Sequence, residues 1–185
     1  MFGGIDFLFN NAGTFVGGKP MEDLSESDWD VSCKVHITGV AEFCKLVIPS
    51  MKERGGGAIV NNSSALGWGG IANMAGYAAT KFGTIGLTKC MADEYGQYNI
   101  LVNTVCPGNT WTDISQGEIE YQANTLGIVE TPEDAKKWQE ESSPLGRYGT
   151  AKELAEAMVF LASPAASFIT GATLRVDGGV KGLLT

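Results

Sequence analysis

Short apolar runs that alternate with long helical patterns are the feature of this sequence that most limits its fold. Four such runs occur, at residues 5–9, 58–64, 100–105 and 173–176. An apolar run of this length, bounded by turn residues, is typical of a strand buried on both faces of a parallel sheet. Helical patterns fill the intervals and predict right-handed crossovers that wrap the sheet. Because 185 residues are one domain's worth of chain, we predict a single α/β domain over residues 1–185.

Capping and breaking residues predict where the helices lie. A capping box at residues 25–28 begins a first long helix, which we expect Pro49 and the glycines at 55–57 to close. A second long helix is predicted from about Ala75 to Tyr95. We expect residues 111–147 to be irregular apart from one short helix, which Thr131-Pro132-Glu133-Asp134 begins.

Composition and charge exclude several functional classes. The net charge of −8 argues against a nucleic-acid-binding surface. Cys33, Cys44, Cys90 and Cys106 show no C-x-x-C spacing, which argues against a metal site or a disulfide framework and predicts reduced thiols. No stretch has the length and hydrophobicity of a membrane span or a signal peptide. We therefore predict a cytoplasmic protein that does not bind a membrane.

Tyr77 and Lys81 are four residues apart in the second long helix. Residues at this spacing lie on one face of a helix, one turn from each other. A lysine ammonium favours the ionised form of a nearby phenol, so the pair predicts a tyrosine whose pKa is lowered toward neutrality. Such a tyrosine can give or take a proton at physiological pH. A solvated helix face is the ordinary alternative for this pattern taken alone.

Polar and turn residues follow three of the predicted strands. The first strand is followed by Asn10-Asn11-Ala12-Gly13, the second ends in Ser64, and the third ends before Pro107-Gly108. The carboxyl ends of parallel strands form one edge of the sheet, where ligands bind in open α/β folds. We expect these residues to gather near Tyr77 and Lys81.

The order and spacing of these motifs resemble the classical short-chain dehydrogenases/reductases. Ser64 lies thirteen residues before Tyr77, and Thr112 follows Pro107-Gly108. The resemblance covers nearly the whole chain and implies a Rossmann-like doubly wound parallel sheet and an NAD or NADP cofactor. It also implies a homo-oligomer, either a dimer or a tetramer, in the complete protein.

The resemblance also assigns roles to individual residues. Tyr77 would be the general acid/base, Ser64 would orient the substrate oxygen, and Lys81 would bind the nicotinamide ribose and lower the pKa of the tyrosine. The cofactor would contact Asn11, Ala12, Gly13, Tyr77, Lys81, Pro107, Gly108, Thr110 and Thr112.

The sequence departs from the family pattern in two places. His36 stands where the family usually has an asparagine that is associated with a helix distortion and a proton relay. Imidazole also relays protons near neutral pH, so His36 is a candidate catalytic residue, although we favour a structural or helper role. In addition, none of the 25 glycines forms the family's glycine-rich turn after a strand. The resemblance thus implies the C-terminal part of such a domain, with its first βαβ units absent.

The predicted function is the interconversion of a secondary alcohol and a ketone with NAD(P)(H) at a Ser-Tyr-Lys site. Enoyl reductases of the family space the tyrosine and lysine more widely, so they fit poorly. The segment between Lys89 and Lys136 contains no lysine or arginine, which favours a small, neutral, fairly apolar substrate. The candidate substrate-facing residues are mostly apolar: Leu66, Trp68, Met74 and Trp111. The alternative is an inactive, truncated remnant that serves as an oligomerisation or interaction module, and the activity of this chain by itself is left open.

Overall fold

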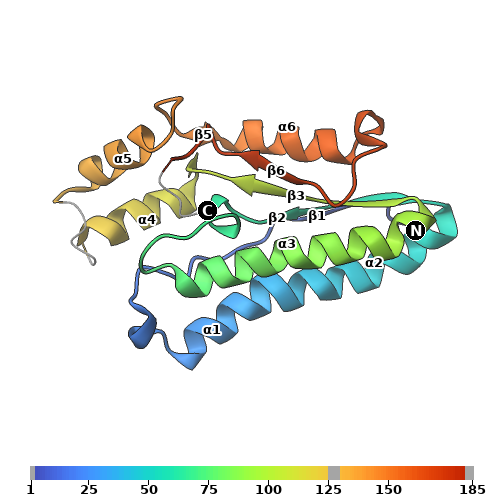
Figure 1. Ribbon diagram of the computed structural model, residues 1–185, viewed down its shortest axis with the longest axis horizontal. Coiled ribbons are helices and arrows are strands. Elements are labelled where there is room, and N and C mark those ends of the chain that lie inside the picture. The colour runs from blue at the N-terminus through green and yellow to red at the C-terminus, as the bar shows by residue number, and fades with distance from the viewer. Residues whose placement is uncertain (1–2, 125–129, 182–185) are drawn as a thin grey trace.

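A parallel sheet of four strands lies at the centre of the protein (Figure 1), in a computed structural model that describes residues 3–124 and 130–181. The strands lie in the order β1 (Phe7–Asn10), β2 (Gly57–Asn62), β3 (Ile100–Pro107) and β6 (Thr173–Val176). All neighbouring pairs are parallel. The four predicted apolar runs are therefore confirmed as strands, with boundaries shifted by one or two residues in three of them.

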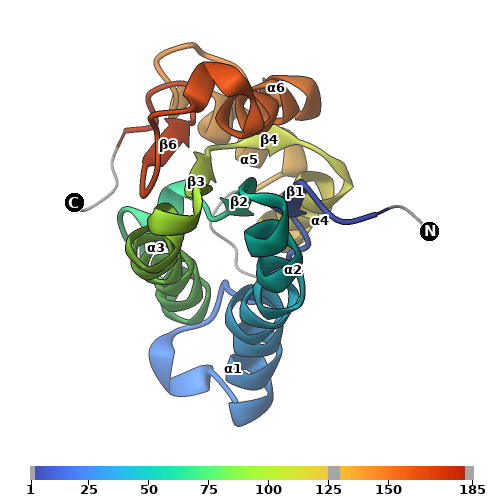
Figure 2. The same ribbon diagram turned by 90° about the vertical axis from the view of Figure 1, so that its right-hand side faces the viewer.

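Helices cover both faces of the sheet, as the end-on view in Figure 2 shows. On one face lie α2 (Val40–Arg54) and α3 (Ala75–Tyr95), and on the other lies α6 (Ala151–Ala162). Buried apolar side chains fill the two spaces between these layers. Met51, Ile59 and Val102 belong to the core under α2 and α3, and Val60, Val105 and Leu161 belong to the core under α6. This three-layer arrangement confirms the predicted Rossmann-like α/β fold.

The remaining elements lie around the sheet. They are α1 (Glu26–Cys33), a π-helical segment (Lys34–Gly39), α4 (Asp113–Asn124), α5 (Pro132–Glu141), β4 (Thr110–Trp111), β5 (Gly149–Thr150) and 3₁₀ turns at Met21–Asp23, Ala65–Gly67, Gly96–Tyr98 and Pro164–Ala166. None of the helices in the described ranges is both long and apolar enough to cross a membrane.

Local capping chemistry explains most of the helix boundaries. The predicted capping box is present, since the Ser25 hydroxyl accepts from the Asp28 backbone N–H while the Asp28 side chain accepts from the Ser25 N–H. Pro49 does not close the first long helix as expected, because it lies inside α2. The helix ends at Gly55, whose φ of 82° is the left-handed conformation that glycine adopts without strain.

The prediction that residues 111–147 are irregular apart from one short helix is wrong for α4, which spans Asp113–Asn124. A hydroxyl-based turn precedes it, in which the Ser115 Oγ accepts from the Thr112 N–H at 2.8 Å. Gly117 and several polar residues weaken the helical pattern of this segment in the sequence. Helix α4 packs against α5, and this tertiary contact supplies stability that local propensity does not.

The first strand lies at an edge of the described sheet, where it pairs with β2. Its Leu8 and Asn10 face α2, whereas Phe7 and Phe9 are 54% and 42% exposed on the opposite face. The prediction that residues 5–9 are buried on both faces is therefore wrong, since no described element packs over Phe7 and Phe9. The structure does not support the further prediction that the first βαβ units are absent.

A chain of buried polar side chains crosses the sheet beneath its carboxyl edge. The Asn10 Nδ2 donates to the Asn61 Oδ1 at 2.8 Å, and the Asn61 Nδ2 donates to the Thr88 Oγ1 at 2.9 Å. The Thr104 hydroxyl donates to the same Thr88 oxygen at 2.6 Å. Three strands and α3 are thus joined by side-chain hydrogen bonds, which fixes the position of α3 relative to the strand ends.

Candidate active site

Ser64 and Tyr77 meet at the carboxyl edge of the sheet, as predicted. Ser64 follows β2 and caps a 3₁₀ turn, where its hydroxyl accepts from the Leu66 N–H at 3.1 Å. Its side chain also lies close enough to the phenol of Tyr77, on the first turns of α3, to lower the pKa of that phenol. Two hydroxyl groups from separate elements are therefore brought together at this edge of the sheet.

Lys81 lies one turn beyond Tyr77 on the same face of α3. Its Nζ is 5.5 Å from the centroid of the Tyr77 ring and donates to the Asn62 carbonyl at 3.1 Å. Only 4% of the residue is exposed. Burial disfavours the ammonium and lowers the pKa of Lys81 from 10.5 to about 8.

The pKa of Tyr77 moves in the direction opposite to the prediction. Burial disfavours the phenolate and raises the pKa of Tyr77 to about 12, although the nearby hydroxyl of Ser64 opposes this effect. The negative charge of Glu118 raises it further. In this state of the protein Tyr77 is therefore a protonated phenol at neutral pH.

His36 sits in the middle of the π-helical segment and is 2% exposed. Its Nε2 accepts from the Thr14 backbone N–H at 3.1 Å, and its Nδ1 lies 2.9 Å from the Thr80 hydroxyl. Because the Thr80 hydroxyl donates its single proton to the Tyr77 carbonyl at 2.9 Å, the Nδ1 must be the donor of the bond to Thr80. His36 is therefore the neutral Nδ1–H tautomer. Burial and the nearby Lys81 charge lower its pKa to about 4.

These contacts favour the structural role for His36 over a proton relay. Both ring nitrogens are engaged, one with the loop after β1 and the other with α3, next to the carbonyl of Tyr77. The ring also lies edge-on to the Tyr77 ring at a centroid distance of 5.5 Å. His36 thus holds the loop that contains Gly13 against the helix that carries Tyr77 and Lys81.

The predicted cofactor residues at the end of β1 are brought close to Lys81. The Asn11 Oδ1 accepts from the Asn62 Nδ2 at 2.9 Å. A Cβ atom on Gly13 would lie 3.6 Å from the His36 Nε2 and 3.8 Å from the Lys81 Nζ. Ala12 lies between Asn11 and Gly13 and is exposed.

The predicted cofactor residues that follow β3 form a separate group. Pro107 ends β3, the Gly108 N–H donates to the Val176 carbonyl at 3.1 Å, and the Thr110 hydroxyl donates to the Gly108 carbonyl at 3.1 Å. Thr112 precedes α4 and is exposed. No described contact joins this group to Ser64, Tyr77 or Lys81, so its part in cofactor binding stays a prediction.

Sequence reasoning missed four residues around Tyr77. Thr14 and Thr80 anchor His36, as described above. Phe15 packs against Tyr77 with a ring-centroid distance of 5.9 Å. Glu118 is a half-buried carboxyl on α4 whose pKa is raised by burial to about 7. No motif in the sequence marks these residues, because the loop after β1 and helix α4 are brought together only by the fold.

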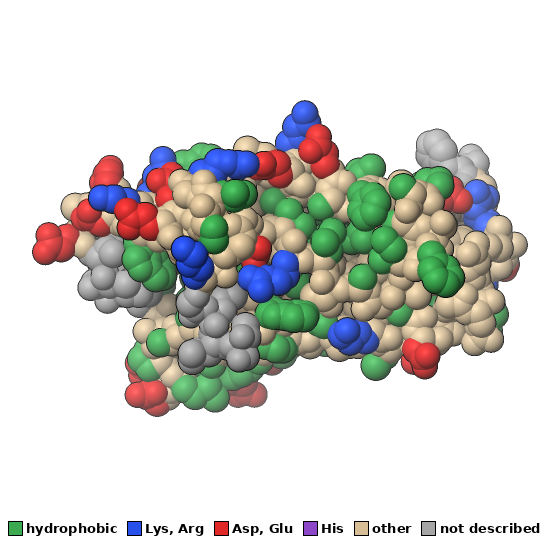
Figure 3. All heavy atoms as spheres, turned by 45° about the horizontal axis from the view of Figure 1, so that its top comes forward, with side chains coloured by type: hydrophobic (Ala, Val, Ile, Leu, Met, Phe, Trp, Pro, Cys, Tyr) green, Lys and Arg blue, Asp and Glu red, His purple; other side chains and the backbone are tan. Residues whose placement is uncertain are grey.

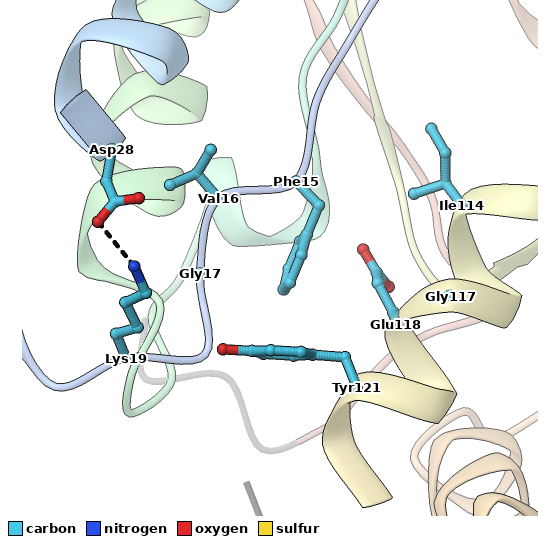
Figure 4. Close-up of a pocket in the computed structure, with 9 residues that line it drawn as sticks. All are labelled: Phe15, Val16, Gly17, Lys19, Asp28, Ile114, Gly117, Glu118 and Tyr121. Atoms are coloured by element: carbon cyan, nitrogen blue, oxygen red, sulfur yellow. Dashed lines mark hydrogen bonds and ion pairs between the residues drawn. The ribbon is translucent and has the colours of Figure 1, made fainter. Parts of the chain in front are cut away.

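A cavity of about 380 Å³ lies beside this site, between the loop after β1 and α4 (Figure 4). It is lined by Phe15, Val16, Gly17, Lys19, Asp28, Ile114, Gly117, Glu118 and Tyr121. The four residues predicted to face the substrate are not among them. Leu66 is buried, whereas Trp68 is 43% exposed and Trp111 is 41% exposed. The Met74 sulfur lies next to Gly17, 2.6 Å from where a Cβ atom on that glycine would be.

Comparison with known proteins identifies the chain's relatives. A family model described as "Enoyl-(Acyl carrier protein) reductase" matches residues 1–181. The chain is 36% identical to the levodione reductase of Leifsonia aquatica over 181 residues, which is 96% of this chain and 65% of that protein. It thus spans about two thirds of the length of the curated relatives that it matches.

Solved structures of relatives have the same fold. An NAD⁺-bound xylitol dehydrogenase matches with a TM-score of 0.91 and 34% identity, over 96% of this chain and 70% of that one. A gluconate 5-dehydrogenase from Burkholderia cenocepacia, in complex with NADP and tartrate, matches with a TM-score of 0.83 and 33% identity, over 96% of this chain and 65% of that one.

Proposed function

This chain belongs to the short-chain dehydrogenase/reductase family, and we propose that it interconverts a secondary alcohol and a ketone with NAD or NADP through Ser64, Tyr77 and Lys81. The observation that supports this most strongly is the position of the Ser64 side chain beside the phenol of Tyr77, with the buried ammonium of Lys81 5.5 Å from the centroid of the Tyr77 ring. Two donors aimed at one oxygen, with a cation next to the proton donor, suit the reduction of a carbonyl group.

In the proposed reduction the ketone oxygen accepts hydrogen bonds from the hydroxyls of Ser64 and Tyr77. The carbonyl carbon gains a hydride, the C=O π bond becomes an O–H bond, and the Tyr77 O–H bond breaks. The bound nicotinamide cofactor supplies the hydride. Tyr77 is left as a phenolate, which the ammonium of Lys81 stabilises until a proton returns from solvent. The raised pKa of Tyr77 keeps the phenol protonated at neutral pH, as reduction requires.

Polar groups at the ends of β1 and β2 support the cofactor part of this proposal. An ammonium has three N–H donors, and Lys81 uses one of them on the Asn62 carbonyl. The Asn62 Oδ1 is buried without a hydrogen-bond partner among the described residues. The remaining lysine donors, Asn62 and the nearby backbone of Gly13 would contact the hydroxyls of a nicotinamide ribose. Both NAD and NADP are compatible with these residues.

Two other functions fit the observations less well. The description of the family model names an enoyl reductase, but the four-residue spacing of Tyr77 and Lys81 favours reduction of a carbonyl, following the resemblance described above. The comparisons do not favour an inactive remnant, because the relatives are named as oxidoreductases.

Steady-state kinetics on the full-length natural protein test the proposal. NADH or NADPH oxidation is measured with cyclic ketones and, in parallel, an enoyl thioester. We expect Tyr77→Phe to lower kcat for the ketone by about 100-fold or more while the Kd for the cofactor changes little. Ser64→Ala should lower kcat without weakening cofactor binding. Tyr98→Phe is the matched control, because Tyr98 is 40% exposed.

Two outcomes would contradict the proposal. A Tyr77→Phe variant that keeps a substantial part of the ketone reductase activity would remove Tyr77 from the proton transfer. A wild-type enzyme that reduces the enoyl thioester and no ketone would assign the chain to the other reaction.

We also propose that the complete protein is a homo-oligomer in the cytoplasm. The outer surfaces of α2 and α3 expose large apolar side chains, with Phe43 at 58%, Leu46 at 73% and Phe82 at 49%. The resemblance described above implies a homo-oligomer, and these exposed apolar helix surfaces are candidates for its subunit interface. On the face that carries α6, hydrophobic side chains also gather, away from the charged surface around α5 (Figure 3).

All four cysteines are free thiols, which supports a reducing compartment. Light scattering of the wild type and Phe82→Ser tests the oligomer.

A further inference from the structure

We propose that the cavity between the loop after β1 and α4 binds the cationic amino group of an amino ketone or amino alcohol, with the Glu118 carboxylate as its counter-ion. This inference rests on the proposed function, because it names the substrate class of the same site. It replaces the prediction of a neutral, fairly apolar substrate.

Glu118 is the unpaired charge of this cavity. At the other end of the cavity the Lys19 Nζ and the Asp28 Oδ2 form an ion pair at 2.9 Å, drawn as the dashed line in Figure 4. Within the described ranges Glu118 has no hydrogen bond or ion pair, and its carboxylate points into the space between Phe15 and Ile114. The side chains that line the cavity therefore carry a net charge of −1 when Glu118 is ionised. That charge disfavours anionic substrates and leaves a place for one cation.

Among the residues at 3–124 and 130–181, no lysine, arginine or histidine pairs with Glu118. The titratable groups that interact with it are Tyr77 and Tyr148, whose pKa values its charge raises, and neither can supply a positive charge. Burial in this environment raises the pKa of the carboxyl to about 7. A ligand ammonium beside the carboxylate would provide the opposite charge that the protein lacks.

Aromatic rings complete the environment that an ammonium group prefers. Phe15, from the loop after β1, and Tyr121, from α4, line the same cavity as Glu118 (Figure 4). Aromatic faces attract cations through the ring quadrupole, and pockets for substituted ammonium groups combine such rings with an anion. The Phe15 ring also packs on the Tyr77 ring at 5.9 Å. An amino group in the cavity and a carbonyl oxygen at Tyr77 can therefore belong to one small molecule.

The test compares two probes of the same shape that differ in charge. The first is 4-(dimethylamino)cyclohexanone, which is cationic at neutral pH, and the second is its neutral isostere 4-isopropylcyclohexanone. For the wild type we expect a preference of about tenfold or more in kcat/KM for the amine, because the aromatic rings and the counter-ion both attract its ammonium group. Glu118→Gln should abolish this preference, because it should lower kcat/KM for the amine about tenfold or more relative to kcat/KM for the isopropyl ketone. Glu120→Gln, an exposed carboxylate on the same helix, is the control.

Calorimetric binding of both probes to the enzyme without cofactor separates this inference from the proposed function. If the amine binds more tightly in a Glu118-dependent way but neither ketone is reduced, the cation site stands and the proposed reaction fails. If both ketones are reduced and the amine is neither bound nor turned over in preference to its isostere, the cation site is refuted and the proposed reaction stands. Equal losses for both probes in Glu118→Gln would likewise refute the cation site, since they would mean that Glu118 only supports the structure.

Discussion

Replacing Lys81 with methionine should make the protein more stable while it removes the proposed activity. Lys81 is buried, and its pKa falls from 10.5 in the unfolded chain to about 8 in the folded protein. At roughly 1.4 kcal/mol for each tenfold change in proton affinity, this lower pKa means that the buried ammonium destabilises the fold by about 3 kcal/mol below pH 8. Methionine has a similar length and no charge. The lost hydrogen bond from Nζ to the Asn62 carbonyl offsets about 1.5 kcal/mol, which leaves a net gain of about 1–2 kcal/mol.

The pH dependence of this difference is the decisive measurement. Between pH 8 and 10.5 the unfolded chain binds a proton at Lys81 that the folded protein does not, so this residue's contribution makes wild-type stability rise with pH. Urea unfolding of the wild type and of Lys81→Met at about pH 7 and about pH 10 should therefore show the gap between them closing. Lys89→Met, at an exposed position on the same helix, should show no such change. A Lys81→Met variant that is less stable at pH 7, with a difference independent of pH, would refute the reasoning.

Three further predictions concern the supports of the site. The pKa of His36 falls from 6.5 to about 4 on folding, so protonation of this residue in the unfolded chain destabilises the wild type as the pH drops from 6.5 to 4. His36→Asn should therefore lose less stability than the wild type between about pH 7 and 4. Equal losses in the urea midpoints of the two proteins would contradict this prediction. Gly108→Ala would place a Cβ 2.7 Å from the Asp177 Cα and 2.9 Å from its carbonyl oxygen, so we expect about 1–3 kcal/mol of destabilisation, measured as a lower Tm. Thr88→Val keeps the shape of the side chain but leaves the buried Asn61 and Thr104 donors without their acceptor. We expect the unfolding free energy to fall by roughly 1–3 kcal/mol. A value within about 0.5 kcal/mol of the wild type would disprove this prediction.

The strands and the helix of the candidate site could be predicted from the sequence because their signals are local. The apolar run at residues 173–176 and the long helix Ala75–Tyr95 match the structure. A tyrosine and a lysine four residues apart share a helix face whatever packs around them. The Ser64–Tyr77 contact follows from the parallel topology, which brings strand ends to one edge of the sheet.

The properties that depend on burial could not be predicted in this way. Proximity of a lysine alone predicts a lowered tyrosine pKa, but burial acts on Tyr77 and Lys81 together and dominates both. Whether β1 is covered on its second face depends on the neighbours that the fold gives it and not on its own residues. Glu118 reaches the site on α4, which the sequence pattern did not indicate as a helix.

The π-helical segment Lys34–Gly39 also determines which way the side chains of α1 point around the helix axis. A π turn closes an i→i+5 hydrogen bond and so holds one residue more than an α turn. One extra residue rotates α1 by about 100° around the shared helix axis, relative to an uninterrupted α-helix. Asp28 on α1 is thereby directed to the cavity, where it pairs with Lys19. Deleting a single residue from this segment would turn Asp28 away from Lys19 and free a cation at the mouth of the cavity. The net charge of the cavity lining thus depends on one inserted residue more than a full helical turn away from Asp28.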